Sequence, residues 1–280
     1  MKILITGSKG FVGRNLINRI LDRYETKTYD FNVVNFDECS ANISKVDVVI
    51  HLASKIDVSE SFKNPRELIY NNYVGTLNIL EAMRINGISK LIFLSSQGIY
   101  GNNINVDEDD TSKISVLEPY SLSKLLSENT IKLYSRVYGI NYVIFRPSHL
   151  YGNDQSKGIV PLLLNRIMTN SDIEIGNNIS RDLLNVDDLI DAITMALDME
   201  GNWVFNLGTG AQTTLMELIE IISKILNKKL NVTINKNLVR NTQSERWSEL
   251  ANINKIKPFG WHPKRELKTW LNENIKIIVK

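Results

Sequence analysis

The amino-acid sequence predicts an α/β protein with a doubly wound parallel sheet, on three observations. Short β-rich runs alternate with helical patterns through the first half of the chain, as they do in right-handed βαβ units. The run at Asp47–Leu52 is almost continuously apolar, which suits a strand covered on both faces. A glycine-rich turn separates the first predicted strand from the first predicted helix.

The elements of the first half follow in order. A buried strand at Lys2–Thr6 leads into a helix at Phe11–Leu21, whose apolar residues recur with helical spacing. The other predicted strands are a weak one at Lys27–Asp30 and stronger ones at Asp47–Leu52, Leu91–Ser95 and Tyr142–Arg146. Helical patterns lie at Leu68–Asn86 and Ser121–Tyr138.

Beyond about residue 152 the alternation loosens, although several elements can still be recognised. The helical segments are Pro161–Met168, Asp188–Leu197, Leu215–Leu226 and Glu266–Ile278, and Trp203–Leu207 has the pattern of a strand that returns to the sheet. We therefore expect two domains interleaved in sequence. The larger comprises residues 1–155 and about 183–207, and the smaller comprises about 156–182 and 208–280.

Composition narrows the function class. The net charge of +2 is too small to argue for nucleic-acid binding, and no stretch approaches the roughly 18 apolar residues of a membrane span. The one cysteine, Cys39, excludes an internal disulfide and fits a reducing compartment. The N-terminal apolar run stops after three residues and is no secretory signal. We expect a soluble, cytoplasmic protein with no nucleic-acid, membrane or metal site.

The segment Thr6–Gly13, TGSKGFVG, has the spacing of a dinucleotide-binding turn. Gly7 permits the tight turn, Gly10 lets the backbone approach a pyrophosphate, and Gly13 lets the helix pack closely on the strand. The helix N-terminus then offers free N–H groups and a partial positive charge to the phosphates. Because the glycines lie between a strand and a helix, they predict a Rossmann-type cofactor site.

Asp30 ends the second predicted strand, 17 residues beyond Gly13. A carboxylate at such a position accepts hydrogen bonds from the adenosine ribose and repels a 2′-phosphate, so Asp30 favours NAD over NADP. Lys9 and Arg14 lie nearby and could receive a 2′-phosphate, which keeps NADP possible. A loop aspartate without a ligand is the simpler alternative.

Tyr120 and Lys124 lie four residues apart at the start of a predicted helix and project from the same face. A nearby ammonium lowers the pKa of a phenol from about 10, which suits proton exchange with a substrate hydroxyl near neutral pH. Ser96 follows a predicted strand, 24 residues before Tyr120, at the edge where doubly wound sheets bind ligands. It could hydrogen-bond the reacting oxygen or simply cap the strand.

Eight motifs, in the same order along the chain, resemble those of the extended short-chain dehydrogenase/reductases. This group contains nucleotide-sugar epimerases, dehydratases and 4-ketoreductases. The motifs are TGSKGFVG (6–13), HLAS (51–54), NNYVGT (71–76), SSQGIYG (95–101), YSLSK (120–124), RPSHLYG (146–152), RDLLNVDDL (181–189) and NLGTG (206–210).

The resemblance implies roles for the matching residues. The catalytic set is Ser96, Tyr120 and Lys124. With Asp30 included, the expected cofactor-binding residues are Gly7, Gly10, Phe11, Val12, Gly13, Asp30, Leu52, Ala53, Ser54, Asn72, Tyr120, Lys124, Pro147 and Ser148. The expected substrate-binding residues are Ser96, Gln97, His149, Arg181 and Arg240.

Two of these substrate assignments have plain structural alternatives. His149 replaces the more usual asparagine of its motif and is equally compatible with a packed loop histidine. Arg181 could instead pair locally with an acidic neighbour such as Asp182.

The resemblance implies NAD(P)-dependent oxidoreduction at C4 of a nucleoside-diphosphate sugar, by a 4-epimerase or a 4-ketoreductase. Gln97-Gly98 replaces the Asp-Glu that 4,6-dehydratases of the group typically carry, which argues against that alternative. A non-catalytic NAD(P)-binding protein is the other alternative. In relatives the helices that match Leu68–Arg84 and Ser121–Tyr138 form a four-helix bundle across a two-fold axis, so we expect a homodimer.

Overall fold

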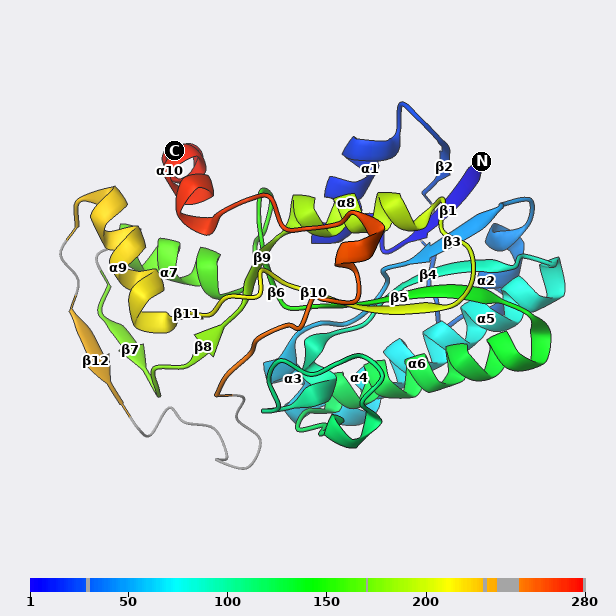
Figure 1. Ribbon diagram of the computed structural model, residues 1–280, viewed down its shortest axis with the longest axis horizontal. Helices are drawn as coiled ribbons and strands as arrows, with labels where there is room; N and C mark the ends of the chain where they lie inside the picture. Colours follow the sequence, from blue (N-terminus) through cyan, green and yellow to red (C-terminus); the bar gives the residue numbers. More distant parts are fainter. Residues whose placement is uncertain (29–30, 170, 229–230, 236–246, 279–280) are drawn as a thin grey trace.

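A computed structural model of the protein describes residues 1–28, 31–169, 171–228, 231–235 and 247–278. The described chain forms a larger part, built on a parallel sheet, and a smaller part at one end of the long axis (Figure 1). No helix in these described ranges is long and apolar enough to cross a membrane.

The larger part contains a six-stranded parallel sheet in the order β10-β5-β4-β3-β1-β2. Its strands are β1 (Lys2–Thr6), β2 (Glu25–Lys27), β3 (Val48–His51), β4 (Lys90–Leu94), β5 (Asn141–Pro147) and β10 (Trp203–Leu207). Because β2 and β3 pair on opposite sides of β1, the strand order reverses there. A crevice for ligands is expected at the carboxyl ends of strands at such a point. The predicted fold class is confirmed.

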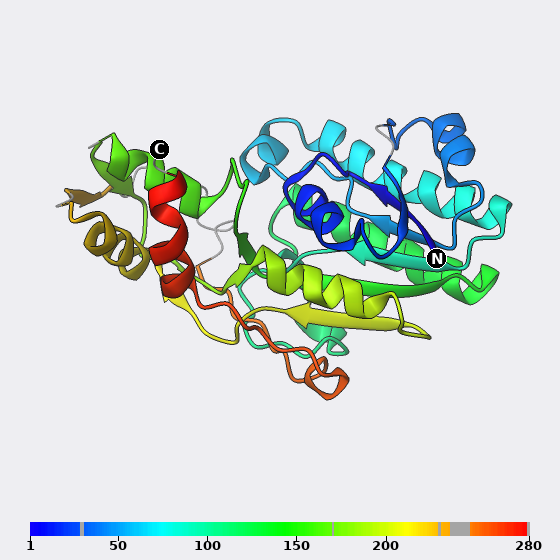
Figure 2. The same ribbon diagram turned by 90° about the horizontal axis from the view of Figure 1, so that it is seen from above.

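Successive residues of a strand point to opposite faces of the sheet, so apolar strand residues project from both faces, and helices cover both. Ile3 and Ile5 pack in one core with residues of α1 (Phe11–Ile20) and α8 (Val186–Ala196), which lie side by side (Figure 2). Leu4, between them, packs in the opposite core. The helices of that second core are α2 (Phe36–Ile43), α5 (Gly75–Asn86) and α6 (Pro119–Tyr138).

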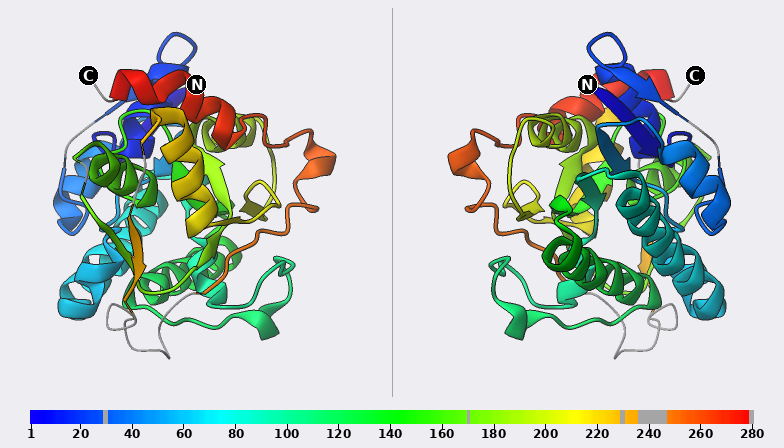
Figure 3. Two further views of the ribbon diagram at one scale, coloured as in Figure 1. Left: turned by 90° about the vertical axis from the view of Figure 1, so that its left-hand side faces the viewer. Right: turned by 90° about the vertical axis from the view of Figure 1, so that its right-hand side faces the viewer.

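The smaller part has a third apolar core. It is formed by α7 (Ile159–Met168), α9 (Leu215–Leu226) and α10 (Leu267–Ile278), of which α9 and α10 are neighbours (Figure 3). Two-stranded pairs complete it and connect it to the sheet. They are β6 (His149–Tyr151) with β9 (Leu183–Asn185), β7 (Ile173–Ile175) with β12 (Val232–Ile234), and β8 (Ser180–Arg181) with β11 (Thr213–Thr214). The domain boundaries given above stay a prediction.

Most of the predicted elements begin and end within two residues of the predicted bounds, but two regions differ. The helical pattern at Leu68–Asn86 is divided into α4 (Pro65–Ile69), a π-helical turn at Tyr70–Val74, and α5. β2 ends at Lys27, earlier than expected, and residues 29 and 30 lie outside the described part.

Two helices are additional to the prediction, α2 and α3 (Val58–Lys63). Each begins at a side-chain cap, since Asn35 accepts from the backbone N–H of Asp37 and Asp57 accepts from that of Glu60. Capping by such residues stabilises a helix start by about 1 kcal/mol, which matters most in a short helix.

Candidate functional site

The glycine turn between β1 and α1 is packed so closely that side chains are excluded. Gly7 has φ +70°, and a Cβ there would lie 2.6 Å from the backbone nitrogen of Ala53. A Cβ on Gly13 would lie 2.3 Å from the carbonyl oxygen of Gly7. Gly10 is the N-cap of α1 and brings no side chain to the first helical turn. This cradle fits the phosphates of a dinucleotide.

The end of β3 is fixed beside this turn by a buried histidine that the sequence analysis did not single out. His51 Nδ1 lies 2.7 Å from Thr6 Oγ1, and its Nε2 lies 3.1 Å from Thr76 Oγ1. Burial, assisted by the charge of Lys124, lowers the pKa of His51 to about 3, so the ring is neutral. Thr6 Oγ1 also accepts from the backbone N–H of Ala53.

Asn72 links the segment after β3 to α6. Its Oδ1 accepts from the backbone N–H of Lys55 at 2.8 Å, and its Nδ2 donates to the Lys55 carbonyl at 3.0 Å. The same Nδ2 lies 3.0 Å from Ser123 Oγ, one residue before Lys124. The expected cofactor segment at residues 52–54 is therefore tied to the helix that carries the expected catalytic pair.

Tyr120 and Lys124 share one face of α6, with Lys124 Nζ 5.8 Å from the centroid of the Tyr120 ring. Lys124 is buried and donates to the carbonyl oxygen of Leu94, at the end of β4, over 2.8 Å. Burial lowers the pKa of Lys124 to about 7, although the Glu128 carboxylate opposes this shift. The half-buried Tyr120 phenol thus lies beside an amine whose protonation depends on burial and on the Glu128 carboxylate.

Ser96 directly follows the end of β4. It is half-buried, and its Oγ accepts from the backbone N–H of Gly98 as the cap of a 3₁₀ turn at Gln97–Tyr100. Gln97, expected to contact substrate, is buried and donates from Nε2 to the carbonyl oxygen of Arg146 over 3.1 Å. Its amide therefore contacts β5.

The end of β5 carries Pro147, followed by Ser148 and His149. The backbone N–H of Ser148 donates to the Leu207 carbonyl, next to β5 in the sheet. The backbone N–H of His149 donates to Glu249 Oε1 over 2.8 Å, and His149 Nδ1 lies 2.8 Å from the same oxygen. Glu249 is buried, whereas the His149 side chain is 37% exposed. The sequence analysis did not find Glu249.

Of the two arginines predicted to bind substrate, the structure describes only Arg181. Arg181 is half-buried on β8, and its Nη1 donates to the Ser180 carbonyl over 2.8 Å. Asp182, weighed above as its local partner, is fully buried and accepts from the backbone N–H groups of Thr209 and Gly210. Arg240 and Asp30 both lie outside the described residues.

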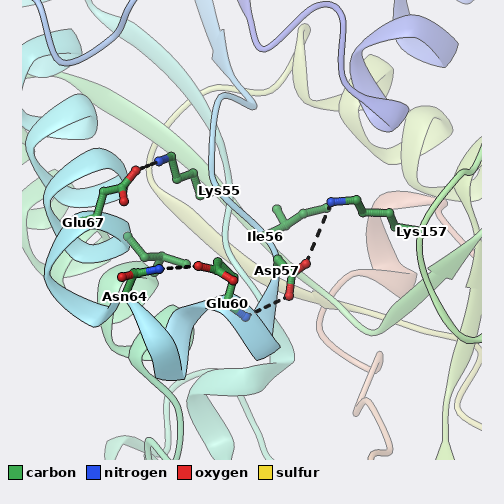
Figure 4. Close-up of a pocket in the computed structure, with 8 residues that line it drawn as sticks. Lys55, Ile56, Asp57, Glu60, Asn64, Glu67 and Lys157 are labelled. Atoms are coloured by element: carbon green, nitrogen blue, oxygen red, sulfur yellow. Dashed lines mark hydrogen bonds and ion pairs between the residues drawn. The ribbon is translucent and has the colours of Figure 1, made fainter.

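A cavity of about 400 Å³ opens beside the segment that follows β3 (Figure 4). It is lined by Lys55, Ile56, Asp57, Glu60, Asn64, Glu67, Leu68 and Lys157. Two ion pairs form between residues that line the cavity. Lys55 pairs with Glu67, and Lys157 pairs with Asp57 at 3.8 Å. The catalytic candidates do not line it, although Lys55 is held by Asn72. Its mixed charges offer donors and acceptors to a hydroxyl-rich ligand.

No group of three or more side chains suited to hold a metal occurs within the described ranges. The carboxyl edge of the sheet carries the Tyr120 phenol, the Lys124 amine and the Ser96 hydroxyl near the glycine turn.

Comparison with known proteins agrees with this arrangement. Residues 3–208 match the model of the NAD dependent epimerase/dehydratase family. The chain is 33% identical to a Methanocaldococcus jannaschii protein named "Putative UDP-glucose 4-epimerase", with 99% of this chain and 97% of that protein covered. It is 28% identical to the Escherichia coli dTDP-4-dehydro-6-deoxyglucose reductase, with the same coverage of each chain.

Among solved structures, the fold matches that of the Thermotoga maritima UDP-glucose 4-epimerase with UDP-glucose. The TM-score is 0.88 at 24% identity, with 99% of this chain and 98% of that chain covered. Other structures with the same fold contain NAD or NADPH. The motifs, the parallel sheet and the family match together show that the chain belongs to the NAD-dependent epimerase/dehydratase family, the extended short-chain dehydrogenase/reductases.

Proposed function

We propose that the protein catalyses oxidoreduction at C4 of a nucleoside-diphosphate sugar, as a 4-epimerase or a 4-ketoreductase. The observation that carries the proposal is the Tyr120–Lys124 pair on one face of α6, with the Lys124 ammonium bonded to the strand end that precedes Ser96. A phenol beside an ammonium is suited to exchange a proton near neutral pH. The adjoining glycine cradle supports NAD or NADP as the cofactor.

Each residue has a distinct task in this reaction. Tyr120 accepts the proton of the C4 hydroxyl during oxidation and returns a proton to the oxygen during reduction. Lys124 stabilises the phenolate, and Ser96 hydrogen-bonds the same sugar oxygen. The glycine turn at Gly7 and Gly13 would hold a nicotinamide cofactor, which would supply the hydride chemistry at C4. Oxidation removes one proton and one hydride from the sugar, and reduction adds one of each, so atoms, charge and electrons balance.

Two features favour C4 redox chemistry without elimination. Gln97 and Gly98 follow Ser96 and bring no carboxylate to that position, and the Gln97 amide is engaged with Arg146. Relatives over nearly the whole chain include a UDP-glucose 4-epimerase of Rhizobium meliloti and a 4-keto-sugar reductase, which supports both versions. The smaller part of the molecule, together with Arg181 on β8 and His149 on β6, is the proposed nucleotide-sugar side.

We also infer NAD as the preferred cofactor, a homodimer formed through α5 and α6, and a cytoplasmic location. Apolar side chains that are exposed on these helices support the dimer. They are Ile85, Leu122, Leu133, Val137 and Tyr138. Cys39 is buried, and burial raises the pKa of its thiol to about 12, which suits a reduced thiol in a reducing compartment.

Turnover of defined nucleotide sugars tests the proposal. The purified chain is incubated with UDP-glucose, UDP-galactose and a dTDP-4-keto-6-deoxyhexose, with and without NADH or NADPH. Interconversion of the UDP-sugars without added cofactor identifies an epimerase, whereas stoichiometric consumption of reduced cofactor with the keto-sugar identifies a reductase. Tyr120→Phe is the matched control, because it keeps the ring and removes the proton donor. Absence of both reactions in the wild-type protein contradicts the proposal.

A further inference from the structure

A fully buried ion pair lies beneath the proposed catalytic pair, between α6 and β5. Glu128 and Arg146 are 0% and 1% exposed. Arg146 Nε donates to Glu128 Oε1 over 3.0 Å, and Arg146 Nη2 donates to Glu128 Oε2 over 2.6 Å. This two-point geometry is the strong form of a carboxylate–guanidinium contact. Glu128 lies one helical turn beyond Lys124 on α6.

The pair also holds the end of β4. Ser95 Oγ donates to Glu128 Oε1 over 2.5 Å, and Lys124 Nζ donates to the carbonyl oxygen of Leu94 over 2.8 Å. Two successive turns of α6 therefore bind two successive residues of the strand end. Ser96 is the next residue, so its position relative to the Tyr120 phenol depends on both contacts.

On the other side, Arg146 connects the pair to β10. Its Nη1 donates to the Tyr100 hydroxyl, which donates to Asn206 Oδ1 over 3.0 Å. The same Nη1 donates to the carbonyl oxygen of Glu108 over 3.2 Å. The guanidinium thus has hydrogen-bond partners besides Glu128, and these hold the cation in place against the Glu128 carboxylate.

Glu128 is held in its ionised form. Burial by itself raises the pKa of this carboxyl, but the attraction of Arg146, hydrogen bonds from Arg146 and Ser95, and the charge of Lys132 together lower it. Lys132 Nζ lies 3.7 Å from Glu128 Oε2 on the solvent side of α6. A buried carboxylate that stays charged projects a strong field on neighbouring groups, because little water screens it.

Lys124 is the neighbour whose charge depends on that field. Burial lowers the pKa of Lys124 to about 7, and Glu128 is the charge that opposes this. The other groups around the ammonium are the Tyr120 phenol on α6, the face of the Phe93 ring on β4 at 5.0 Å, and the neutral His51 on β3. None of these three brings a permanent negative charge.

We propose that Glu128 is a positioning residue of the reaction, which favours the charged form of Lys124 and fixes the end of β4 that carries Ser96. The inference rests on the proposed function, because Lys124 and Ser96 have their roles only there. Net stabilisation is a weak alternative explanation for the pair, since desolvation offsets most of the attraction in a buried ion pair. The consequence for Lys124 is specific and measurable.

The test compares E128Q with S95A. E128Q keeps the size of the side chain and removes its charge, whereas S95A removes one hydrogen bond to Glu128 and keeps the charge. For each variant the pH profiles of kcat and of NADH affinity are measured from pH 6 to 9, with far-UV circular dichroism to verify folding. In E128Q the basic limb of both profiles is expected to move to lower pH by about one unit, because the pKa of Lys124 falls. S95A is expected to lower kcat with its midpoints unchanged.

Profiles of E128Q that coincide with the wild-type profiles would overturn the proposal, as would an equal shift in S95A. If E128Q does not fold, E128Q/R146Q removes both buried charges and leaves no unpaired guanidinium. It must also show a downward shift, smaller than that of E128Q because the repelling guanidinium is lost as well. NADH affinity separates this inference from the proposed function. A wild-type protein that turns over no nucleotide sugar refutes the function, whereas an unshifted NADH profile in E128Q refutes the role of Glu128.

Discussion

Replacement of Lys124 by methionine is expected to abolish turnover and yet stabilise the protein at acidic pH. Lys124 is 4% exposed, and burial lowers its pKa from 10.5 to about 7. Holding an ammonium in this position costs free energy whenever it must be charged. Methionine keeps the length and apolar character of the side chain and removes the charge.

The size of the effect follows from the pKa difference between the unfolded and folded chain. A difference of roughly 3.5 units, at about 1.4 kcal/mol per unit, is a penalty of about 5 kcal/mol. The variant also loses the hydrogen bond to the Leu94 carbonyl, which costs about 1–3 kcal/mol. At pH 6 the methionine variant is therefore expected to be more stable by about 2–4 kcal/mol.

The sign of the pH dependence is fixed by proton binding. Between pH 7 and 10.5 the unfolded chain holds a proton on Lys124 that the folded chain has released, so wild-type stability rises with pH across this interval. The penalty is fully present below pH 7 and is relieved as the pH approaches 10.5. The advantage of the variant should consequently shrink by about 2 kcal/mol between pH 7 and 9.

Urea unfolding at pH 6, 7, 8 and 9, in the absence of cofactor, measures the difference directly, because the pH dependence of all other groups cancels between wild type and variant. Lys63→Met is the matched control, since the Lys63 side chain is 74% exposed and should give a difference that does not vary with pH. A Lys124→Met difference that is constant from pH 6 to 9 refutes the reasoning, because Lys124 would then not be a buried, depressed cation.

Three further predictions address the cofactor, the chemistry and the assembly. Gly13→Ala should weaken NADH binding by tenfold or more, on the order of 1.4 kcal/mol, since its Cβ would lie 2.3 Å from the Gly7 carbonyl oxygen; fluorescence titration measures it. Tyr120→Phe should lose about 10²- to 10⁴-fold in kcat with NADH affinity unchanged, so equal losses in both would count against proton transfer by this phenol. Val137→Glu, at a 58% exposed position on α6, should convert a dimer to monomers in sedimentation velocity, and a wild-type protein that is already monomeric contradicts the dimer.

Local patterns were sufficient to predict the sheet, the close packing of the glycine turn and the shared face of Tyr120 and Lys124. The glycine spacing at Gly7 and Gly13 follows from backbone contacts within one βα unit, and the shared face of Tyr120 and Lys124 follows from helical geometry. Both are properties of short segments, so the sequence contains them directly. Their roles in binding and catalysis stay predictions that the experiments above address.

Contacts between distant segments could not be predicted in this way. Glu249 is 100 residues from His149, and no periodic pattern connects the two. Asp182 is a local neighbour of Arg181 in sequence, yet its carboxylate binds the backbone of Thr209 and Gly210 on the turn after β10. These contacts depend on how distant segments of the chain pack together in the fold, which a local sequence pattern does not describe.

The helix α6 connects most of these features, which has a consequence for the proposed dimer. Ser123 binds Asn72, which holds Lys55 at the rim of the cavity, while Lys124 and Glu128 bind the end of β4. Three of the exposed apolar residues proposed for the dimer, Leu122, Leu133 and Val137, lie on the opposite side of the same helix. A rigid helix transmits displacement along its length, so separation of the subunits should reduce kcat as well as change the mass. Turnover that is unchanged in a monomeric Val137→Glu variant would show that α6 is positioned by its internal hydrogen bonds alone.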